Sequence, residues 1–237
     1  MKKYIGTKQI EAEPMTMGEA YERGLLQVGR VPDAEHAKRM GYHVKYADGY
    51  ESWSPAEPFE EAYKLADTSL DRMQIEAEEV NGRYVKLAAF IDSGKMDEVV
   101  NDMYNKCLLE MQCCTMFDYI RLLDTRIQRM QGSDGAKVIK MNFGMAIMAL
   151  KAGFPIRRSG WNGKGLMVFK QVPAHIDSDI IPKMQSIPQS AKDLILKGKG
   201  FIDYTSQCLI YNENTGRADS WVPSISDVFA EDWEIVE

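Results

Sequence analysis

Apolar and polar positions follow three different patterns along the 237-residue chain, which predicts three modules. In residues 1–66, short alternating runs are separated by turn residues, as is typical of strands. In residues 67–131, apolar residues recur every three or four positions, which predicts long helices. In residues 138–237, one helical pattern precedes several strand-like runs. The fold class predicted is therefore α+β: a small α+β module, a central antiparallel helical hairpin, and a small antiparallel-sheet domain with one N-terminal helix.

The first module contains turn and cap signals between its short runs. The predicted elements are a strand within Tyr4–Ala12, a helix over Ala20–Val28, a hairpin over Tyr42–Trp53 and a helix from Ser54 to Tyr63. Thr16 and Glu19 have the spacing of a capping box, which indicates a helix start. Gly49 separates the two alternating runs and marks the hairpin turn. No function is predicted for this module.

The second module contains two amphipathic helical patterns. Its apolar residues are Leu70, Met73, Ala77, Val80, Tyr84, Leu87, Phe90 and Ile91, then Leu108, Met111, Thr115, Tyr119, Leu122, Leu123, Ile127 and Met130. The two helices are joined around Asp92–Asp97 and should form an antiparallel hairpin, with Gly82 as a weak point. A hairpin of this size buries little apolar surface. Its exposed stripe is therefore expected to pack on another module or another subunit.

The third module follows a linker, residues 131–137, that is rich in turn residues. It should begin with a helix, because Asn142 is a good N-cap and Gly153 is a good helix stop. Strands are predicted at Ile156–Arg158, Leu166–Val172, Phe201–Tyr204, Cys208–Tyr211 and Asp219–Val222, with a turn at Glu213–Gly216.

Composition narrows the classes of function. The net charge is −6, and residues 1–136 hold 17 basic and 24 acidic residues, against 12 and 11 in residues 137–237. This balance argues against broad DNA or RNA binding, which needs a basic face. There is no run of 18 apolar residues and no signal-peptide core, so we expect a cytoplasmic protein without a membrane span. The four cysteines are expected to be reduced thiols and the three histidines are far apart, so we predict no metal, cofactor or catalytic residue.

The residue types that most often bind nucleotides are concentrated in residues 157–165 (RRSGWNGKG). Arg158 can pair with phosphate, glycines such as Gly163 bring backbone N–H groups close to an anion, Trp161 can stack on a base, and Asn162 offers an amide. These four are candidate ligand-binding residues. The glycine spacing matches neither the Rossmann nor the Walker motif. The alternative is an ordinary hairpin turn with its Trp packed on the core and its arginines solvated.

A second cluster of candidates lies near the C-terminus. Its hydroxyl and carboxylate groups can bond ribose hydroxyls or a base edge, and its members are Trp221, Ser224, Ser226, Asp227, Asp232 and Trp233. Trp221, Ser226 and Asp227 are its candidate ligand-binding residues. The alternative is a terminal strand and turn without a ligand. For Trp233 this pattern favours a position in the core.

Residues 138–237 resemble the second type of Thoeris anti-defence protein, a phage family. The matching pieces are Met141–Gly144, the run that ends at Gly153, Arg157–Arg158, Gly160–Gly165 and Trp221–Trp233. Members bind cyclic ADP-ribose isomers made by bacterial TIR-domain proteins, without cleaving them, in pockets at subunit interfaces, and some hold cyclic dinucleotides at a separate site. The resemblance implies that such a pocket lies near Arg158, Trp161, Asn162, Trp221, Ser226 and Asp227.

Residues 69–130 are more loosely similar to the helical-hairpin modules of anti-CBASS and first-type Thoeris anti-defence sponges. The similar pieces are Leu70–Arg72, Lys86–Leu87, Phe90–Ile91, Met116, Tyr119, Leu122 and Arg126–Ile127. This similarity implies binding of cyclic oligonucleotides or oligomerisation. Lys86, Tyr119 and Arg126 are the candidates for a second site.

The sequence therefore predicts a phage anti-defence sponge, not an enzyme, that sequesters cyclic nucleotide immune signals in the cytoplasm of the infected host. Its expected ligands are glycocyclic ADP-ribose and cyclic di- or trinucleotides, and a homo-oligomer is expected. The alternatives are a signal-degrading phosphodiesterase or glycohydrolase, and a phage structural or assembly protein.

Overall fold

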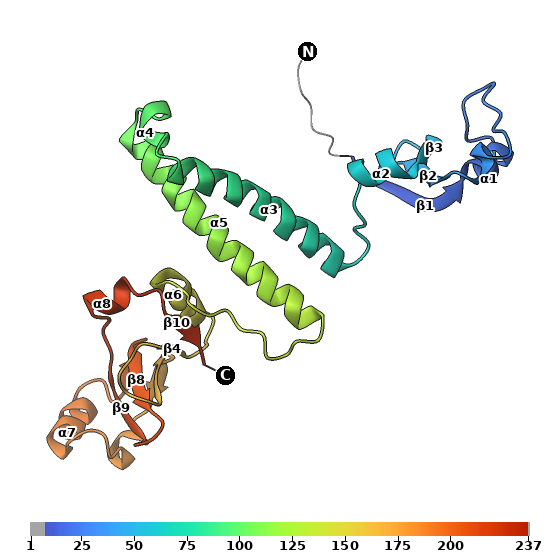
Figure 1. Cartoon of the computed structure of the whole chain (residues 1–237). Helices are drawn as coiled ribbons and strands as arrows, with labels where there is room; N and C mark the ends of the chain where they lie inside the picture. Colours follow the sequence, from blue (N-terminus) through green and yellow to red (C-terminus); the bar gives the residue numbers. More distant parts are fainter. Residues whose placement is uncertain (1–7, 237) are drawn as a thin grey trace. The chain divides into compact units, whose positions relative to one another are not determined.

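The computed structural model describes residues 8–236, and its helices and strands are labelled in Figure 1. Contacts between residues divide the chain into two compact units, residues 1–76 and residues 77–237. Both helices and antiparallel sheets are present, which confirms the predicted α+β class. The three predicted modules do not coincide with these two units, and the division into modules stays a prediction.

The first unit is built on a three-stranded antiparallel sheet. Its elements are β1 (Ile10–Thr16), α1 (Met17–Glu22), the 3₁₀ helix η1 (His36–Lys38), β2 (Met40–Tyr46), β3 (Glu51–Pro55) and α2 (Ala56–Ala62), with strand order β1-β2-β3. Trp53 is the largest side chain of its small core, and its indole N–H donates to the carbonyl of Met15 (2.9 Å). A Cβ at Gly41 would lie 2.5 Å from the Trp53 ring. Glycine at this position therefore lets the Trp53 ring approach the backbone of β2.

The elements predicted for the first unit from local sequence signals were partly right. The predicted hairpin forms, and Thr16 and Glu19 make the predicted capping box. The helix ends at Glu22 and not at Val28, because Gly24 adopts a φ of 72° that a helix cannot continue. The next helix spans Ala56–Ala62 and not Ser54–Tyr63, because β3 continues to Pro55, which is also the N-cap residue. The part of the predicted first strand before Lys8 lies outside the described residues.

The predicted helical hairpin is present in α3 (Ser69–Asp92) and α5 (Met103–Met130), with a short helix α4 (Met96–Val99) in the connection (Figure 1). The predicted apolar face of α5 was only partly right. Leu108, Met111, Tyr119 and Leu122 are 38–59% exposed, whereas the more buried side chains of α5 are Leu109, Cys113, Met116, Ile120, Leu123 and Ile127. The helix carries two apolar stripes of the same period, and the period alone does not tell which one faces α3.

Gly82 is exposed in the middle of α3, and a Cβ there would contact nothing within 4 Å. Gly82→Ala is therefore expected to stabilise the hairpin by about 1 kcal/mol, because alanine loses less backbone entropy in a helix. A higher melting temperature for this variant would agree, and an unchanged or lower one would contradict it. The matched variant Gly153→Ala should destabilise the protein instead, because Gly153 has a φ of 91°.

The C-terminal part contains a five-stranded antiparallel sheet with strand order β10-β4-β5-β8-β9. The elements are α6 (Phe143–Lys151), β4 (Ile156–Arg158), β5 (Leu166–Lys170), β8 (Cys208–Asn212), β9 (Arg217–Ser220), α8 (Ile225–Val228) and β10 (Trp233–Ile235). Asn142 caps α6 as predicted and accepts from the N–H of Met145 (3.0 Å). The core lies between α6 and the sheet, and Trp233 is fully buried in it, as predicted.

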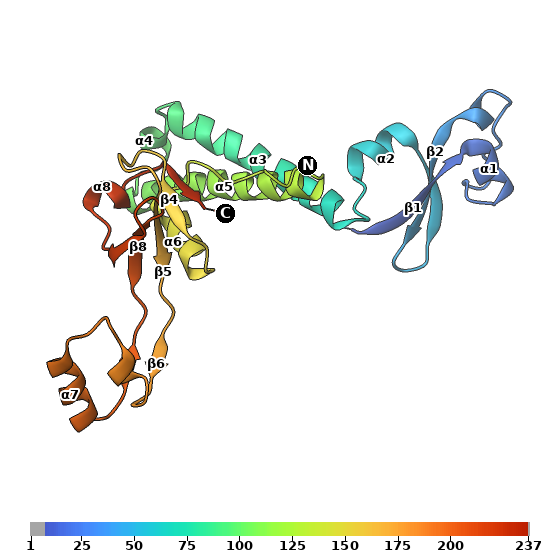
Figure 2. The ribbon, with the colours of Figure 1, turned by 90° about the horizontal axis from the view of Figure 1, so that it is seen from below.

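An arm extends from β5 and β8 (Figure 2). It consists of β6 (Ala174–Ile176), η2 (Ile181–Lys183), α7 (Gln189–Lys197) and β7 (Ile202–Tyr204). Only β7 was predicted. The helix α7 starts after Pro188 without a side-chain cap, so the usual start signal is missing.

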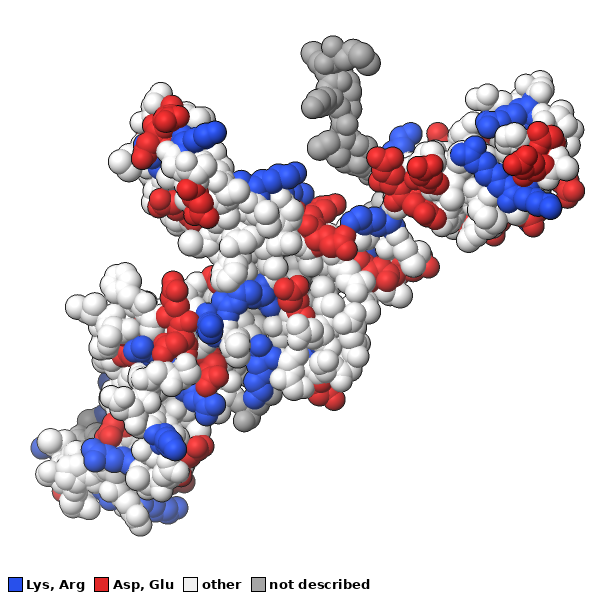
Figure 3. All heavy atoms as spheres, in the orientation of Figure 1, with Lys and Arg blue, Asp and Glu red and all other residues white. Residues whose placement is uncertain are grey.

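No helix in the described residues is long and apolar enough to cross a membrane. On the face shown in Figure 3, basic and acidic side chains are interspersed and no continuous basic surface appears. The charge pattern on this face agrees with the net negative charge of the sequence.

Candidate functional site

Arg158 is the centre of an ion-pair cluster between β4, α8 and β10. Its Nε donates to Asp232 Oδ1 (2.7 Å), and its Nη1 donates to Asp227 Oδ1 (2.9 Å) and to the carbonyl of Ser226 (3.3 Å). The side chains of Arg158, Asp227 and Asp232 are 18%, 10% and 28% exposed. The two carboxylates raise the pKa of Arg158 further, with Asp232 as the main cause. The guanidinium is therefore occupied by side chains of its own domain.

Asp227 is the only buried charged residue in the described part of the chain. Its Oδ1 accepts from Arg158 and from the indole N–H of Trp161 (3.1 Å), and its Oδ2 accepts from the backbone N–H and hydroxyl of Ser224. Burial alone would raise the pKa of this carboxyl. The hydrogen bonds from Arg158, Ser224 and Trp161 outweigh burial and lower the pKa to about 2.

This depressed pKa predicts an acid-dependent loss of stability. The carboxyl of an unfolded chain has an ordinary pKa of 3.8, so the contribution of Asp227 to stability is complete above that pH and is lost as pH falls toward 2. The expected loss is about 2 kcal/mol for a shift of this size. Chemical unfolding at pH 4 and pH 2 should show a smaller difference for Asp227→Asn than for the wild type. An equal difference in both proteins would contradict this assignment.

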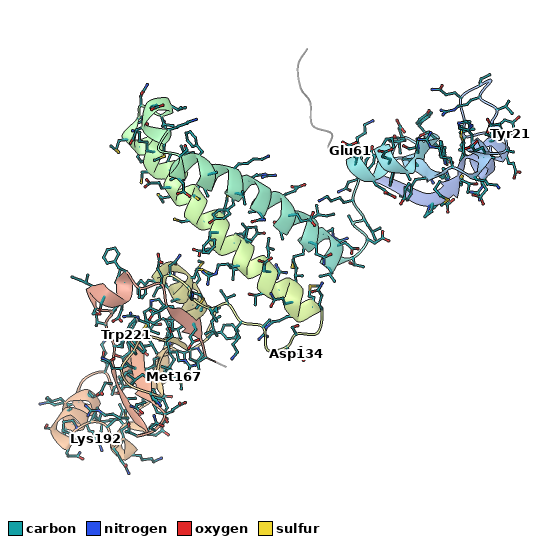
Figure 4. All side chains as sticks on the ribbon, viewed as in Figure 1. Tyr21, Glu61, Asp134, Met167, Lys192 and Trp221 are labelled. Carbon is teal, nitrogen blue, oxygen red and sulfur yellow. The ribbon has the colours of Figure 1, made fainter. Side chains whose placement is uncertain are left out.

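Three tryptophans meet at the surface of the domain. The buried ring of Trp233 lies edge-on to Trp161 (centroids 5.4 Å apart, 78°) and to Trp221 (6.1 Å, 79°). The indole N–H of Trp233 donates to the carbonyl of Asp227 (3.1 Å). Trp161 and Trp221 are half-buried, so each presents part of its ring to solvent. Figure 4 labels Trp221 together with Met167 of β5 in this part of the chain. The result is an aromatic surface with fixed orientation.

The glycine-containing loop, residues 159–165, joins β4 to β5. The N–H of Gly160 donates to Asp232 Oδ2 (2.8 Å), and a Cβ at Gly160 would lie 2.5 Å from that oxygen. Gly165 adopts a φ of 78°, and its carbonyl accepts from the N–H of Glu213. Asn162 and Gly163 are exposed between these fixed points. The loop therefore holds Trp161 on one side and presents Asn162 to solvent.

The structure brings most of the candidate residues together. Trp161, Trp221, Ser226, Asp227 and Arg158 share the cluster around Trp233, and Ser226 is exposed with its hydroxyl 2.8 Å from that of Ser224. The hairpin candidates Lys86, Tyr119 and Arg126 are exposed on α3 and α5 and form no part of this cluster.

Ser224 and Asp232 belong to the second cluster, whose polar groups were predicted to bond ribose or a base, but in the structure their polar atoms bond within the chain. Ser224 and Asp227 form a capping box that starts α8. This Ser-x-x-Asp spacing is a readable signal for a short helix. The contacts of Asp232 with Arg158 and Gly160 join residues more than 70 positions apart, so no local sequence pattern predicts them.

The site combines two partly exposed rings of fixed orientation, Trp161 and Trp221, with carboxylates that already have hydrogen-bond partners. These are features of a binding domain. A family model described as the Thoeris anti-defense 2-like domain matches residues 141–236, and a model named Sequestin matches residues 67–129. The curated protein Thoeris anti-defense 2 of Bacillus phage SP01 is 34% identical over 102 residues, which cover 41% of this chain and 96% of that relative. The chain belongs to the Thoeris anti-defense 2 family.

Both resemblances predicted from the sequence are confirmed by these matches. They support the predicted class of function, an anti-defence sponge that sequesters signals, and they give no support to the two alternatives. The family names indicate a binding protein for small-molecule immune signals.

Proposed function

We propose that the C-terminal domain sequesters glycocyclic ADP-ribose in the host cytoplasm and releases it unchanged. The observation that carries this proposal is the pair of half-buried rings, Trp161 and Trp221, held edge-on against Trp233. An exposed ring face can stack on the adenine of such a ligand. Because the rings are fixed by core contacts, little side-chain entropy is lost when the ligand binds.

The candidate residues divide into two groups by their contacts. Trp161, Asn162, Gly163, Trp221 and Ser226 reach solvent and are proposed to face the ligand. The other two, Arg158 and Asp227, direct their polar atoms at each other and at neighbouring loops, so we assign them the role of holding the site together.

The same contacts favour binding without cleavage. A general acid at neutral pH needs a carboxyl whose pKa is raised toward 7. Hydrogen bonds lower the pKa of Asp227 to about 2 and also lower that of Asp232, mainly through Arg158. Both carboxylates are therefore ionised and already serve as acceptors.

The helical hairpin is proposed to be a second sponge module, within domain limits of 1–66, 67–131 and 138–237. The Sequestin match over residues 67–129 supports this role. Cyclic di- or trinucleotides are the proposed ligands, with Lys86, Tyr119 and Arg126 as candidate contacts. These side chains offer two cations and a ring, which suit phosphates and bases.

A homo-oligomer is proposed because the C-terminal domain exposes large apolar side chains beside Trp221. Val222, Ile225 and Phe229 are 80–81% exposed around α8. Phe229→Asp should lower the mass measured by light scattering, since a charge on an apolar interface disfavours association. Tyr21→Asp, on an exposed ring in the first unit, is the control and should leave the mass unchanged. A mass for Phe229→Asp equal to that of the wild type would remove this face from the interface.

The function is tested by ligand capture. The purified protein is incubated with cyclic ADP-ribose isomers and cyclic di- and trinucleotides, freed of unbound ligand by filtration, and heat-denatured. We expect intact glycocyclic ADP-ribose in the released fraction. Linear products would identify a degrading enzyme instead, and an empty fraction would favour the structural or assembly protein.

A further inference from the structure

Asp232 accepts hydrogen bonds from two residues of the loop 159–165 and from Arg158, which precedes the loop. Its carboxylate accepts from the Arg158 guanidinium (Nε, 2.7 Å) and from the Gly160 N–H (2.8 Å), and its carbonyl accepts from the Ser159 N–H (3.0 Å). We propose that Asp232 positions this loop, and with it Trp161, by acting as the internal acceptor for Arg158 and for the loop N–H groups.

The donors around Asp232 are those of an anion site. A guanidinium and a backbone N–H beside a glycine are the groups with which proteins bind phosphate. Here both groups donate to the carboxylate of Asp232. The approach is close, because a Cβ at Gly160 would lie 2.5 Å from Asp232 Oδ2. No space is left for a second anion between Gly160 and Arg158.

The local charge leads to the same conclusion. Arg158 contributes one positive charge to the cluster, whereas Asp227 and Asp232 contribute two negative charges. A phosphate added to this cluster would meet net negative charge at short range. The ligand is therefore recognised here through its base and ribose, and its phosphates lie away from Arg158 and Gly160. This part of the inference rests on the proposed function.

The test compares Asp232→Ala and Asp232→Asn with the control Glu234→Ala. Glu234 lies in β10, two residues after Asp232, and its carboxylate pairs with Arg157 of β4 (2.6 Å). Asp227 still pairs with Arg158 in the Asp232 variants, so the domain should fold. Hydrogen exchange of residues 159–163 is measured without ligand, and the Kd for glycocyclic ADP-ribose is measured by calorimetry.

For Asp232→Ala we expect faster exchange in the loop, because Gly160 and Arg158 lose their acceptor, and about tenfold weaker binding of the ligand. Asp232→Asn should recover part of the loop protection and part of the affinity, because its amide oxygen can still accept from Gly160. Glu234→Ala should change neither. Unchanged loop exchange in Asp232→Ala would overturn the proposal, and so would tighter binding, which would mean that the carboxylate competes with the ligand. If the wild type binds no ligand, the proposed function fails, and loop exchange still decides the role of Asp232.

Discussion

Trp161→Ala is expected to weaken the binding of glycocyclic ADP-ribose by about tenfold or more, since loss of one base stack costs roughly 1–3 kcal/mol. Trp233 cannot replace Trp161 as a stacking ring, because Trp233 is fully buried. Trp161→Phe should bind with intermediate affinity, since it keeps a ring beside Trp233 but loses the hydrogen bond to Asp227. Isothermal titration calorimetry measures both.

Two controls separate the ligand contact from a loss of folding. Tyr21→Ala removes an exposed ring from the first unit and should leave the Kd unchanged. The melting temperature of Trp161→Ala shows whether the Trp161 contact with Trp233 also supports the core. A Kd equal to that of the wild type in Trp161→Ala would remove this residue from the ligand site.

Elements with local signals could be predicted from the sequence. The N-cap at Asn142, the stop at Gly153 and the capping box of Thr16 depend on residues within one helical turn of each other. The arm that carries α7 has weaker signals, because its helix begins after Pro188 with no side-chain cap. Its existence depends on how β5 and β8 continue, which is a tertiary property.

Two equivalent patterns on one helix caused the main error in the hairpin. Leu108 and Leu109 both belong to apolar stripes with a three- and four-residue period, and only the second is turned toward the hairpin interior. Periodicity gives the number of apolar faces but not their partners. The exposed stripe of α5 is consistent with the expectation that this hairpin packs on something further.

The candidate site shows the same limit. The residue types in the loop and in residues 221–227 predicted which segments form the candidate site, and the structure brings these segments together around Trp233. Their roles depend on pairings such as Arg158 with Asp232, which are 74 positions apart. An arginine beside glycines suits both a ligand phosphate and an internal carboxylate. Only the fold shows that carboxylates occupy the Arg158 guanidinium.

Arg158→Met is accordingly expected to destabilise the C-terminal domain by about 3–5 kcal/mol, the usual cost of leaving a buried charge without its partner. Asp227, which is 7% exposed, would lose the guanidinium that pairs with its carboxylate. A loss of this size should lower the melting temperature of the domain transition by about 10 °C or more. Differential scanning calorimetry of the full chain measures it.

Arg157→Met is the matched control. Arg157 is the neighbouring residue on β4 and also pairs with a carboxylate of β10, but its side chain is 46% exposed. An exposed pair of this kind contributes at most about 1 kcal/mol, so the control should melt within a few degrees of the wild type. Adding Asp227→Asn and Asp232→Asn to Arg158→Met should restore part of the lost stability, because the unpaired charges are then removed. If Arg158→Met melts like the wild type and only its ligand affinity falls, Arg158 contacts the ligand directly and the structural role assigned to it is wrong.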